Sequence, residues 1–222
     1  MEHQSARIKH IVIYPVKSCG RIELEQAFLT VSGLRSGNYA DHEFMVVSND
    51  REFAEANNKP YYDELMYYFL TQRNRRNKKD KPQGLSAMAL IKPELHDGRL
   101  RLTWNYKEPI EIPYDINGGT YRLVRIWEDE SLAIDQGDEI ANWLSDHLGM
   151  GVRLVKAEDS IVRMSRQNYM QNDNPLRFQD SYPIHWFPIE SVQELSQIAK
   201  EEIPWQSFRP QIVVEGMPAQ YE

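Results

Sequence analysis

Lys17 and Ser18 follow an apolar segment directly before Cys19 and Gly20, and they carry groups that could bind an oxyanion. An ammonium, a hydroxyl and the free backbone amides of a glycine-terminated turn together suit a phosphate group. Lys-Ser pairs in turns are also common on solvated surfaces, so the spacing alone leaves a solvent-facing turn as the alternative.

Arg209 lies between Phe208 and Pro210, just before a segment with strand character. Its guanidinium offers a planar fork of donors that fits a phosphate or the edge of a heterocycle. The alternative is a structural salt bridge with one of the many carboxylates. The Asp180-Ser181-Tyr182 segment offers a carboxylate and a hydroxyl together, although ordinary turn chemistry explains it equally well.

Metal chemistry built from protein side chains alone is not expected. The single cysteine, Cys19, cannot form an internal disulfide and cannot by itself build a thiolate site. The six histidines show no ligand spacing. A lone cysteine usually packs as a small hydrophobic side chain, so we assign no catalytic residue and no metal ligand.

Composition excludes several classes of function. A net charge of -7 argues against general binding to nucleic acid or to anionic membrane. The sequence has no apolar run of 18 residues and no apolar core near its amino end, so we expect neither a membrane span nor an export signal. A cytoplasmic location is the default expectation. With 222 residues and 41% hydrophobic content, the chain can bury one or two ordinary cores.

Short β-rich segments separated by turns favour a mainly β fold of the barrel type with a few helices. Apolar residues at helical spacing predict helices over 138–148, with Gly149 as its stop, and over 191–200. Asp97-Gly98 predicts a tight hairpin turn. The predicted strands are 8–16, 25–31, 43–47, 87–92, 99–104, 121–127, 152–156 and 211–215.

The pattern changes between 51 and 84, which we interpret as an insertion. Aromatic residues over 61–69 should pack against the barrel, and 73–81 carries six basic residues in nine. Such a charge run is usually a solvated loop, with an anion-binding patch as the alternative. A polar stretch over 158–174 is predicted to be a long surface loop.

A resemblance to a known family rests on these segments, taken in order: 13–20, 33–35, 41–47, 69–73, 133–137, 143–144, 178–183 and 207–214. They resemble the MOSC family. The family includes the mitochondrial amidoxime-reducing component with its bacterial relatives, and the carboxyl-terminal part of molybdenum cofactor sulfurase.

The resemblance implies a MOSC amino-terminal β-barrel domain over 1–127, with the insertion at about 51–84. Residues 128–222 would form the first part of a MOSC domain that lacks the segment with the metal-ligating cysteine. Cys19 lies in the phosphate-loop motif and does not correspond to that ligand.

The resemblance also implies a cofactor and its contacts. Lys17 and Ser18 would hold the phosphate of a molybdopterin, the molybdenum cofactor. Asp180, Ser181 and Tyr182 would line the pterin, and Arg209 would fork onto it. His42 stands where the family usually has arginine, so phosphate binding should be weaker.

The implied activity is that of oxidoreductases that reduce N-hydroxylated compounds, with an electron-transfer protein as a possible partner. Molybdenum-ion and pyridoxal phosphate binding are further properties associated with the family, as is sulfur transfer. The alternative is a non-catalytic module that has lost the molybdenum ligand and binds a small anion or a protein partner.

Overall fold

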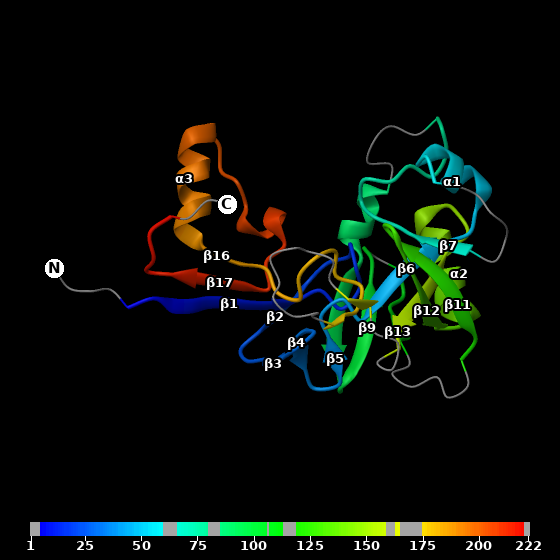
Figure 1. The fold of residues 1–222 in the computed structure, drawn as a ribbon, viewed down its shortest axis with the longest axis horizontal. Coiled ribbons are helices and arrows are strands. Elements are labelled where there is room, and N and C mark those ends of the chain that lie inside the picture. The colour runs from blue at the N-terminus through cyan, green and yellow to red at the C-terminus, as the bar shows by residue number, and fades with distance from the viewer. Residues whose placement is uncertain are drawn as a thin grey trace.

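The computed structural model describes residues 5–59, 66–79, 85–105, 107–112, 119–158, 163–164 and 175–219. A closed barrel occupies one end of the molecule, and a smaller sheet with one helix occupies the other (Figure 1). The predicted mainly β fold of the barrel type is confirmed.

The barrel closes because β11 pairs with β12 on one side and, in parallel, with β7 on the other. Its strands, in spatial order, are β11 (Tyr121–Ile126), β12 (Asp129–Asp135), β13 (Arg153–Ala157), β6 (Phe44–Ser48) and β7 (Met66–Phe69).

Strand β6 shows why the barrel needs a cover. All five of its residues are buried, and alternate side chains join two different cores. Met45 and Val47 pack inside the barrel, whereas Phe44 and Val46 belong to a second core on its outside. A strand buried on both faces requires another layer over its outer side.

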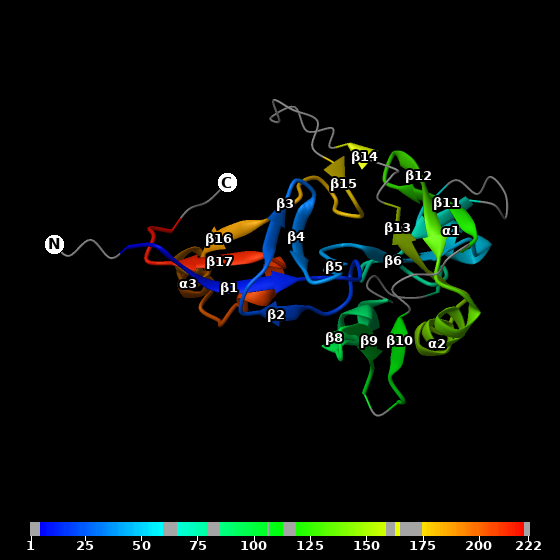
Figure 2. The same cartoon turned by 90° about the horizontal axis from the view of Figure 1, so that it is seen from below.

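Helix α2 (Asp138–Leu148) and a three-stranded sheet provide that layer (Figure 2). The helix buries Ile140 and Leu144 on its inner side and ends at Gly149, which is left-handed at φ 67°. This confirms the predicted helix at both ends. The sheet consists of β8 (Lys92–His96), β9 (Arg99–Thr103) and β10 (Ile110–Ile112).

The smaller sheet joins the two ends of the described chain. Strand β1 (Arg7–Ile13) lies antiparallel to β17 (Ile212–Glu215), with β2 (Ile22–Leu24) and β16 (Trp186–Pro188) at the edges. Helix α3 (Ile189–Ala199) lies over this sheet, as Figure 1 shows.

The remaining elements are short. They are α1 (Arg51–Ala56), η1 (Ser86–Leu90), η2 (Trp205–Phe208), the sheet of β3 (Phe28–Thr30), β4 (Gly33–Ser36) and β5 (Tyr39–Ala40), and the pair β14 (Arg163–Met164) and β15 (Pro175–Leu176).

Two strand predictions need correction. The predicted strand over 87–92 is wrong, because these residues form the 3₁₀ turn η1 and β8 begins only at Lys92. An apolar run without a clear period does not distinguish a helical turn from a strand. The predicted strand over 25–31 is shorter than expected, because only β3 (Phe28–Thr30) lies within it and β2, in another sheet, ends before it at Leu24. Helix α1, which Asp50 caps, was not predicted.

The segment expected to be an insertion contributes a strand to the barrel, since β7 lies within 51–84. Its aromatic residues pack in both cores, as predicted for the described part of 61–69. In the basic run, residues 73–79 are half-buried or exposed, and 80–81 lie outside the described residues. Most of the predicted loop over 158–174 also lies outside them.

The strands on the two sides of position 127 share the barrel, because β12 pairs with β11 directly across it. The division into domains at this position stays a prediction. None of the described helices is both long enough and apolar enough to span a membrane.

Candidate anion and cofactor site

The turn after β1 is held in place by backbone hydrogen bonds to several elements. The amide of Lys17 donates to the carbonyl of Phe44 at 2.8 Å, and that of Gly20 donates to Ile91 at 2.8 Å. A Cβ atom at Gly20 would lie 2.9 Å from the Ile91 carbonyl oxygen, so this close approach requires glycine. Ser18 is left-handed at φ 67°, and its carbonyl accepts a hydrogen bond from Gln72.

Lys17 is buried, and its ammonium points away from solvent into the segment 178–180. Its Nζ donates to the Phe178 carbonyl at 2.7 Å and to Asp180 Oδ1 at 2.6 Å. Burial lowers the pKa of Lys17, although the Asp180 carboxylate opposes that effect. Two protein acceptors thus already bind this cation, which joins two parts of the chain 163 positions apart.

Asp180 is the exposed partner of this pair, with 59% of its side chain accessible. Its Oδ1 also accepts a hydrogen bond of 2.8 Å from the indole Nε1 of Trp127. Burial would raise the pKa of Asp180, but the Lys17 ammonium and the Trp127 hydrogen bond together lower it below its usual range. The carboxylate is therefore ionised at neutral pH. Ser181 is half-buried and Tyr182 is exposed in the same turn.

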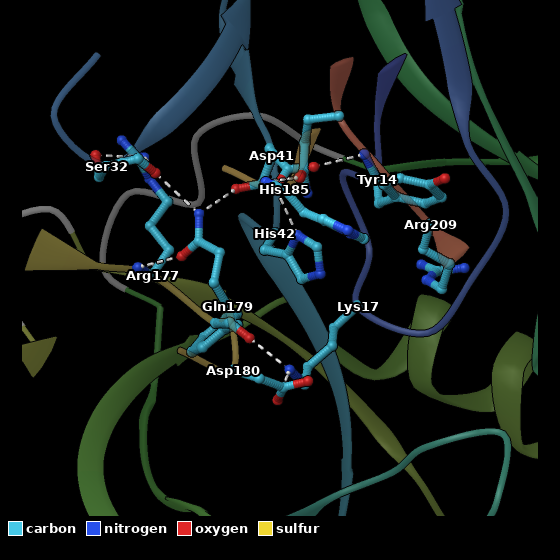
Figure 3. Close-up of polar contacts among 12 residues, drawn as sticks. Tyr14, Lys17, Ser32, Asp41, His42, Arg177, Gln179, Asp180, His185 and Arg209 are labelled. Carbon is cyan, nitrogen blue, oxygen red and sulfur yellow. Dashed lines mark hydrogen bonds and ion pairs between the residues drawn. The ribbon is translucent and has the colours of Figure 1, made fainter. Parts of the chain in front are cut away.

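Arg209 contacts the turn at residues 17–20, although the two are far apart in the sequence. Its Nη1 donates to the Cys19 carbonyl at 2.8 Å, and its guanidinium lies 4.0 Å from the centroid of the Tyr14 ring (Figure 3). Its Nη2 is buried and has no hydrogen-bond partner among the described residues. Burial lowers the pKa of Arg209, which nearby Tyr14 and Cys19 act to raise.

The hydroxyl of Tyr14 is a second donor without a partner among the described residues. The residue is 2% exposed, and its hydroxyl makes no hydrogen bond within the described part of the chain. Burial raises the pKa of Tyr14 to about 12 although Arg209 acts to lower it, so the hydroxyl keeps its proton. Buried polar groups normally have partners, and each exception calls for an explanation. Tyr14 and Arg209, in direct contact, together offer two unused donors suited to an oxyanion.

His42 joins this group through a buried carboxylate. Asp41 is fully buried and accepts hydrogen bonds from the Tyr14 amide at 2.8 Å and from Gln211 at 3.0 Å. The Nδ1 atom of His42 lies 2.6 Å from the same carboxylate. Figure 3 shows Asp41 and His42 beside Tyr14, with a dashed line from Asp41 to the Tyr14 amide. His42 itself is left-handed at φ 52°.

The structure therefore brings most of the predicted site residues to one region. Lys17 and Asp180 touch directly, Arg209 bonds to the turn that holds Ser18, and His42 connects through Asp41 to Tyr14. In the described part of the chain Arg209 forms no ion pair, which disfavours the structural salt bridge.

Sequence reasoning missed Tyr14, Trp127 and Gln211. Tyr14 and Gln211 lie inside segments that resemble the family, so position within those segments was an available signal. Trp127 had no local signal, because it lies 53 positions from its partner Asp180.

The described residues do not form a metal site from protein side chains alone. No group of three or more His, Cys, Asp or Glu side chains that could hold a metal occurs in the described ranges. Cys19 is fully buried, and burial raises the pKa of its thiol to about 12. The neutral thiol is a poor metal ligand, because the thiolate is the form that binds.

The barrel and the turn at its edge define a class of protein. Residues 5–151 match the family described as the MOSC N-terminal beta barrel domain, and the chain belongs to this family.

Two kinds of protein are among its curated relatives. Mitochondrial amidoxime reducing component 2 of Rattus norvegicus is 25% identical over 224 residues, which cover 97% of this chain and 58% of the relative. Molybdenum cofactor sulfurase 1 of Aedes aegypti is 26% identical over 174 residues, covering 75% of this chain and 19% of that protein. This chain thus spans less than two thirds of the length of each.

A solution structure of a Bordetella bronchiseptica protein is also similar. It matches 53% of this chain and 72% of its own length, with 19% identity and a TM-score of 0.37.

Proposed function

We propose that this chain binds a molybdenum cofactor and that Arg209, Tyr14 and the turn at Lys17-Ser18 hold the anionic phosphate of its molybdopterin. The observation that carries the proposal is the pair of buried, unpartnered donors on Arg209 and Tyr14, beside that turn. An Arg fork next to a hydroxyl provides charge-assisted hydrogen bonds to a phosphate. The name of the molybdenum cofactor sulfurase relative supports the choice of cofactor.

The other residues have supporting roles in this proposal. Lys17 holds Asp180 in position and adds positive charge near the phosphate. Asp180, Ser181 and Tyr182 share one turn, in which Asp180 and Tyr182 are exposed, as binding to the pterin edge requires. The bound cofactor would supply the redox chemistry, while these side chains bind and orient it.

By its family, we place this chain next to oxidoreductases that reduce N-hydroxylated compounds. An oxidoreductase of this class needs a source of electrons, and we propose that a separate electron-transfer protein supplies them. Cys19 is buried as a neutral thiol, and the described residues hold no cluster of three or more His, Cys, Asp or Glu side chains, so we assign no molybdenum ligand and no catalytic residue.

A non-catalytic anion- or partner-binding module is the second candidate. The burial of Cys19, the only cysteine in these 222 residues, favours it. We therefore expect the 222-residue chain alone not to reduce benzamidoxime with a chemical reductant. Turnover that tracks bound molybdenum would exclude the second candidate.

The proposed function is tested by measuring molybdenum by mass spectrometry and oxidised pterin by fluorescence in the purified chain. Both should be present, and both should fall at least tenfold in Arg209→Ala, because a charge-assisted fork contributes roughly 1.5–3 kcal/mol per hydrogen bond. Arg99→Ala is the control, since Arg99 pairs with Glu111 on the exposed β9–β10 sheet. Absence of pterin and molybdenum from the unaltered chain, or equal retention by both variants, contradicts the proposal.

A further inference from the structure

Trp127 occupies an unusual backbone position. Ile126 pairs with Asp129, so Trp127 and Glu128 form a two-residue hairpin turn between β11 and β12. Trp127 has a positive φ of 55°, and Glu128 has none. Glycine is the usual residue where only the first central position of such a turn has positive φ. A large aromatic residue in this place is strained, and strain of this kind often accompanies function.

The Trp127 indole is fixed but largely exposed. Its Nε1 donates to Asp180 at 2.8 Å, and Phe69 meets its ring edge-on at a centroid distance of 5.1 Å. Even so, 57% of the residue is accessible. If Trp127 served only to cover Phe69, the indole would be expected to bury most of its area. The hydrogen bond instead holds an accessible ring beside Asp180.

Asp180 indicates what kind of ligand fits beside this ring. Both of the hydrogen bonds that it accepts from described residues, Lys17 and Trp127, go to Oδ1, and the carboxylate is exposed. Its Oδ2 can therefore accept N–H donors from a ligand. Lys17 lies 2.6 Å away, and both Arg163 and Arg209 act electrostatically on Lys17, so a cationic ligand would be repelled.

We propose that the exposed indole of Trp127 is a stacking surface for a planar, uncharged nitrogen heterocycle whose N–H edge donates to Asp180. This inference rests on the proposed function, because Asp180 belongs to the same site, and it adds a residue that recognises the ring. A pterin has this chemistry, and so does a free heteroaromatic substrate. Stacking on an aromatic side chain is tolerant of the ring's identity.

The experiment is calorimetric titration of 6-hydroxymethylpterin, which has no phosphate, into the full chain and its variants. Trp127→Gly should lower the affinity about tenfold, because a stacked ring contributes roughly 1–3 kcal/mol. The same variant should unfold at an equal or higher temperature, because glycine removes the strain of positive φ. Trp127→Phe should keep part of the affinity, since it retains a ring but loses the hydrogen bond to Asp180.

Tyr121→Ala is the matched control, since Tyr121 is 52% exposed on the same hairpin. It should leave pterin affinity unchanged. The inference is overturned if the unaltered chain does not bind the pterin, if Trp127→Gly binds it equally well, or if the cation benzamidine binds better than the pterin. A heteroaromatic amide competing with the pterin would identify the surface as a substrate site, whereas pterin binding without such competition would assign it to the cofactor.

The two proposals can fail separately. Retention of molybdopterin that depends on Arg209 but not on Trp127 would leave the proposed function intact and exclude the stacking surface. The opposite result is binding of free pterin that depends on Trp127, in a chain that retains no cofactor. It would support the stacking surface and exclude the proposed function.

Discussion

The guanidinium of Arg209 lies 4.0 Å from the centroid of the Tyr14 ring, although the two residues belong to the first and last parts of the described chain. A cation over an aromatic face gains about 0.5–2 kcal/mol, more when water is excluded. The contact therefore holds Arg209 in place without using all of its hydrogen-bond donors. Among the described residues neither Arg209 Nη2 nor the Tyr14 hydroxyl has a hydrogen-bond partner, and these are the two donors that we propose bind the ligand.

Tyr14→Phe tests two effects of the unpartnered hydroxyl: its effect on the stability of the fold and its contribution to anion binding. Without added anion, the variant should be as stable as the unaltered chain or more stable by about 1 kcal/mol, because an unsatisfied buried group has been removed. Sulfate should then stabilise it less than it stabilises the unaltered chain. Thermal unfolding with and without sulfate measures both effects, and an equal sulfate effect in the two chains would exclude Tyr14 from the site.

His42→Arg tests the position where the family usually has arginine. If His42 faces the bound anion, the variant should bind sulfate more tightly, because a guanidinium offers a planar fork of donors and an imidazole does not. Calorimetric titration of sulfate into both chains measures the affinities. Unchanged affinity would mean that His42 only orders the turn through its 2.6 Å contact with Asp41.

Asp135→Asn should destabilise the barrel by about 3 kcal/mol, because it removes one partner of a buried ion pair. The carboxylate is 3% exposed and bonds to Arg122 at 2.8 Å and to Arg153 at 2.9 Å. Although burial alone would raise it, the two arginines hold the pKa of Asp135 below its usual range.

Because the pKa of Asp135 is lowered in the folded protein, this residue makes the fold less stable as the pH falls. A carboxyl group with a lowered folded pKa stabilises the fold above its unfolded value of about 4, and this contribution is lost as pH falls through the folded value. Urea unfolding should therefore show a weaker loss of stability in Asp135→Asn between about pH 5 and about pH 3. Parallel curves for the two proteins would contradict the assignment.

Cys19 should make the fold sensitive to alkali. Burial raises the pKa of its thiol from 9.0 to about 12, so its stabilising effect is complete below pH 9 and is lost as pH rises toward 12. The loss can reach about 1.4 kcal/mol per pH unit. In Cys19→Ala the free energy of unfolding, measured with urea, should fall less steeply above pH 9. Near neutrality the variant should be less stable by about 1 kcal/mol, because the substitution leaves a small cavity.

Tyr14 contributes with the same sign above pH 10, since its pKa is also raised to about 12. Tyr14→Phe combined with Cys19→Ala should thus flatten the curve further. Lys17, whose pKa is lowered, acts in the opposite direction and gains stability with rising pH. An equally steep decline in Cys19→Ala would mean that the thiol does not control it.

Local patterns were sufficient for some elements. Helix α2 was predictable because its apolar spacing and Gly149 agree, and the β8–β9 hairpin because Asp97 and Gly98 both tolerate the positive φ of its turn. Strand β7 was not predictable as a strand, because aromatic residues suit a helix face or a loop as well. Its parallel partner β11 lies more than fifty positions away.

The site was predictable only through resemblance. Lys17 lies 163 positions from Asp180, and Arg209 lies 190 positions from Cys19, so no local rule joins them. The order of the motifs indicated Lys17 and Arg209 as site residues. It did not indicate Trp127, nor that the Tyr14 hydroxyl and Arg209 Nη2 would lack partners among the described residues, because these features depend on three-dimensional packing.

The pairing of β1 with β17 has a consequence for biosynthesis. Arg7 and Glu215, which are 208 positions apart, are partners in this sheet. A nascent chain leaves the ribosome amino end first, so β1 lacks its β17 neighbour until translation has passed residue 215. Such long-range pairing gives a high contact order and slow folding. Because Arg209 lies just before β17, which begins at Ile212, the proposed anion site is complete only after both have been translated, and loading of the proposed cofactor must follow that step.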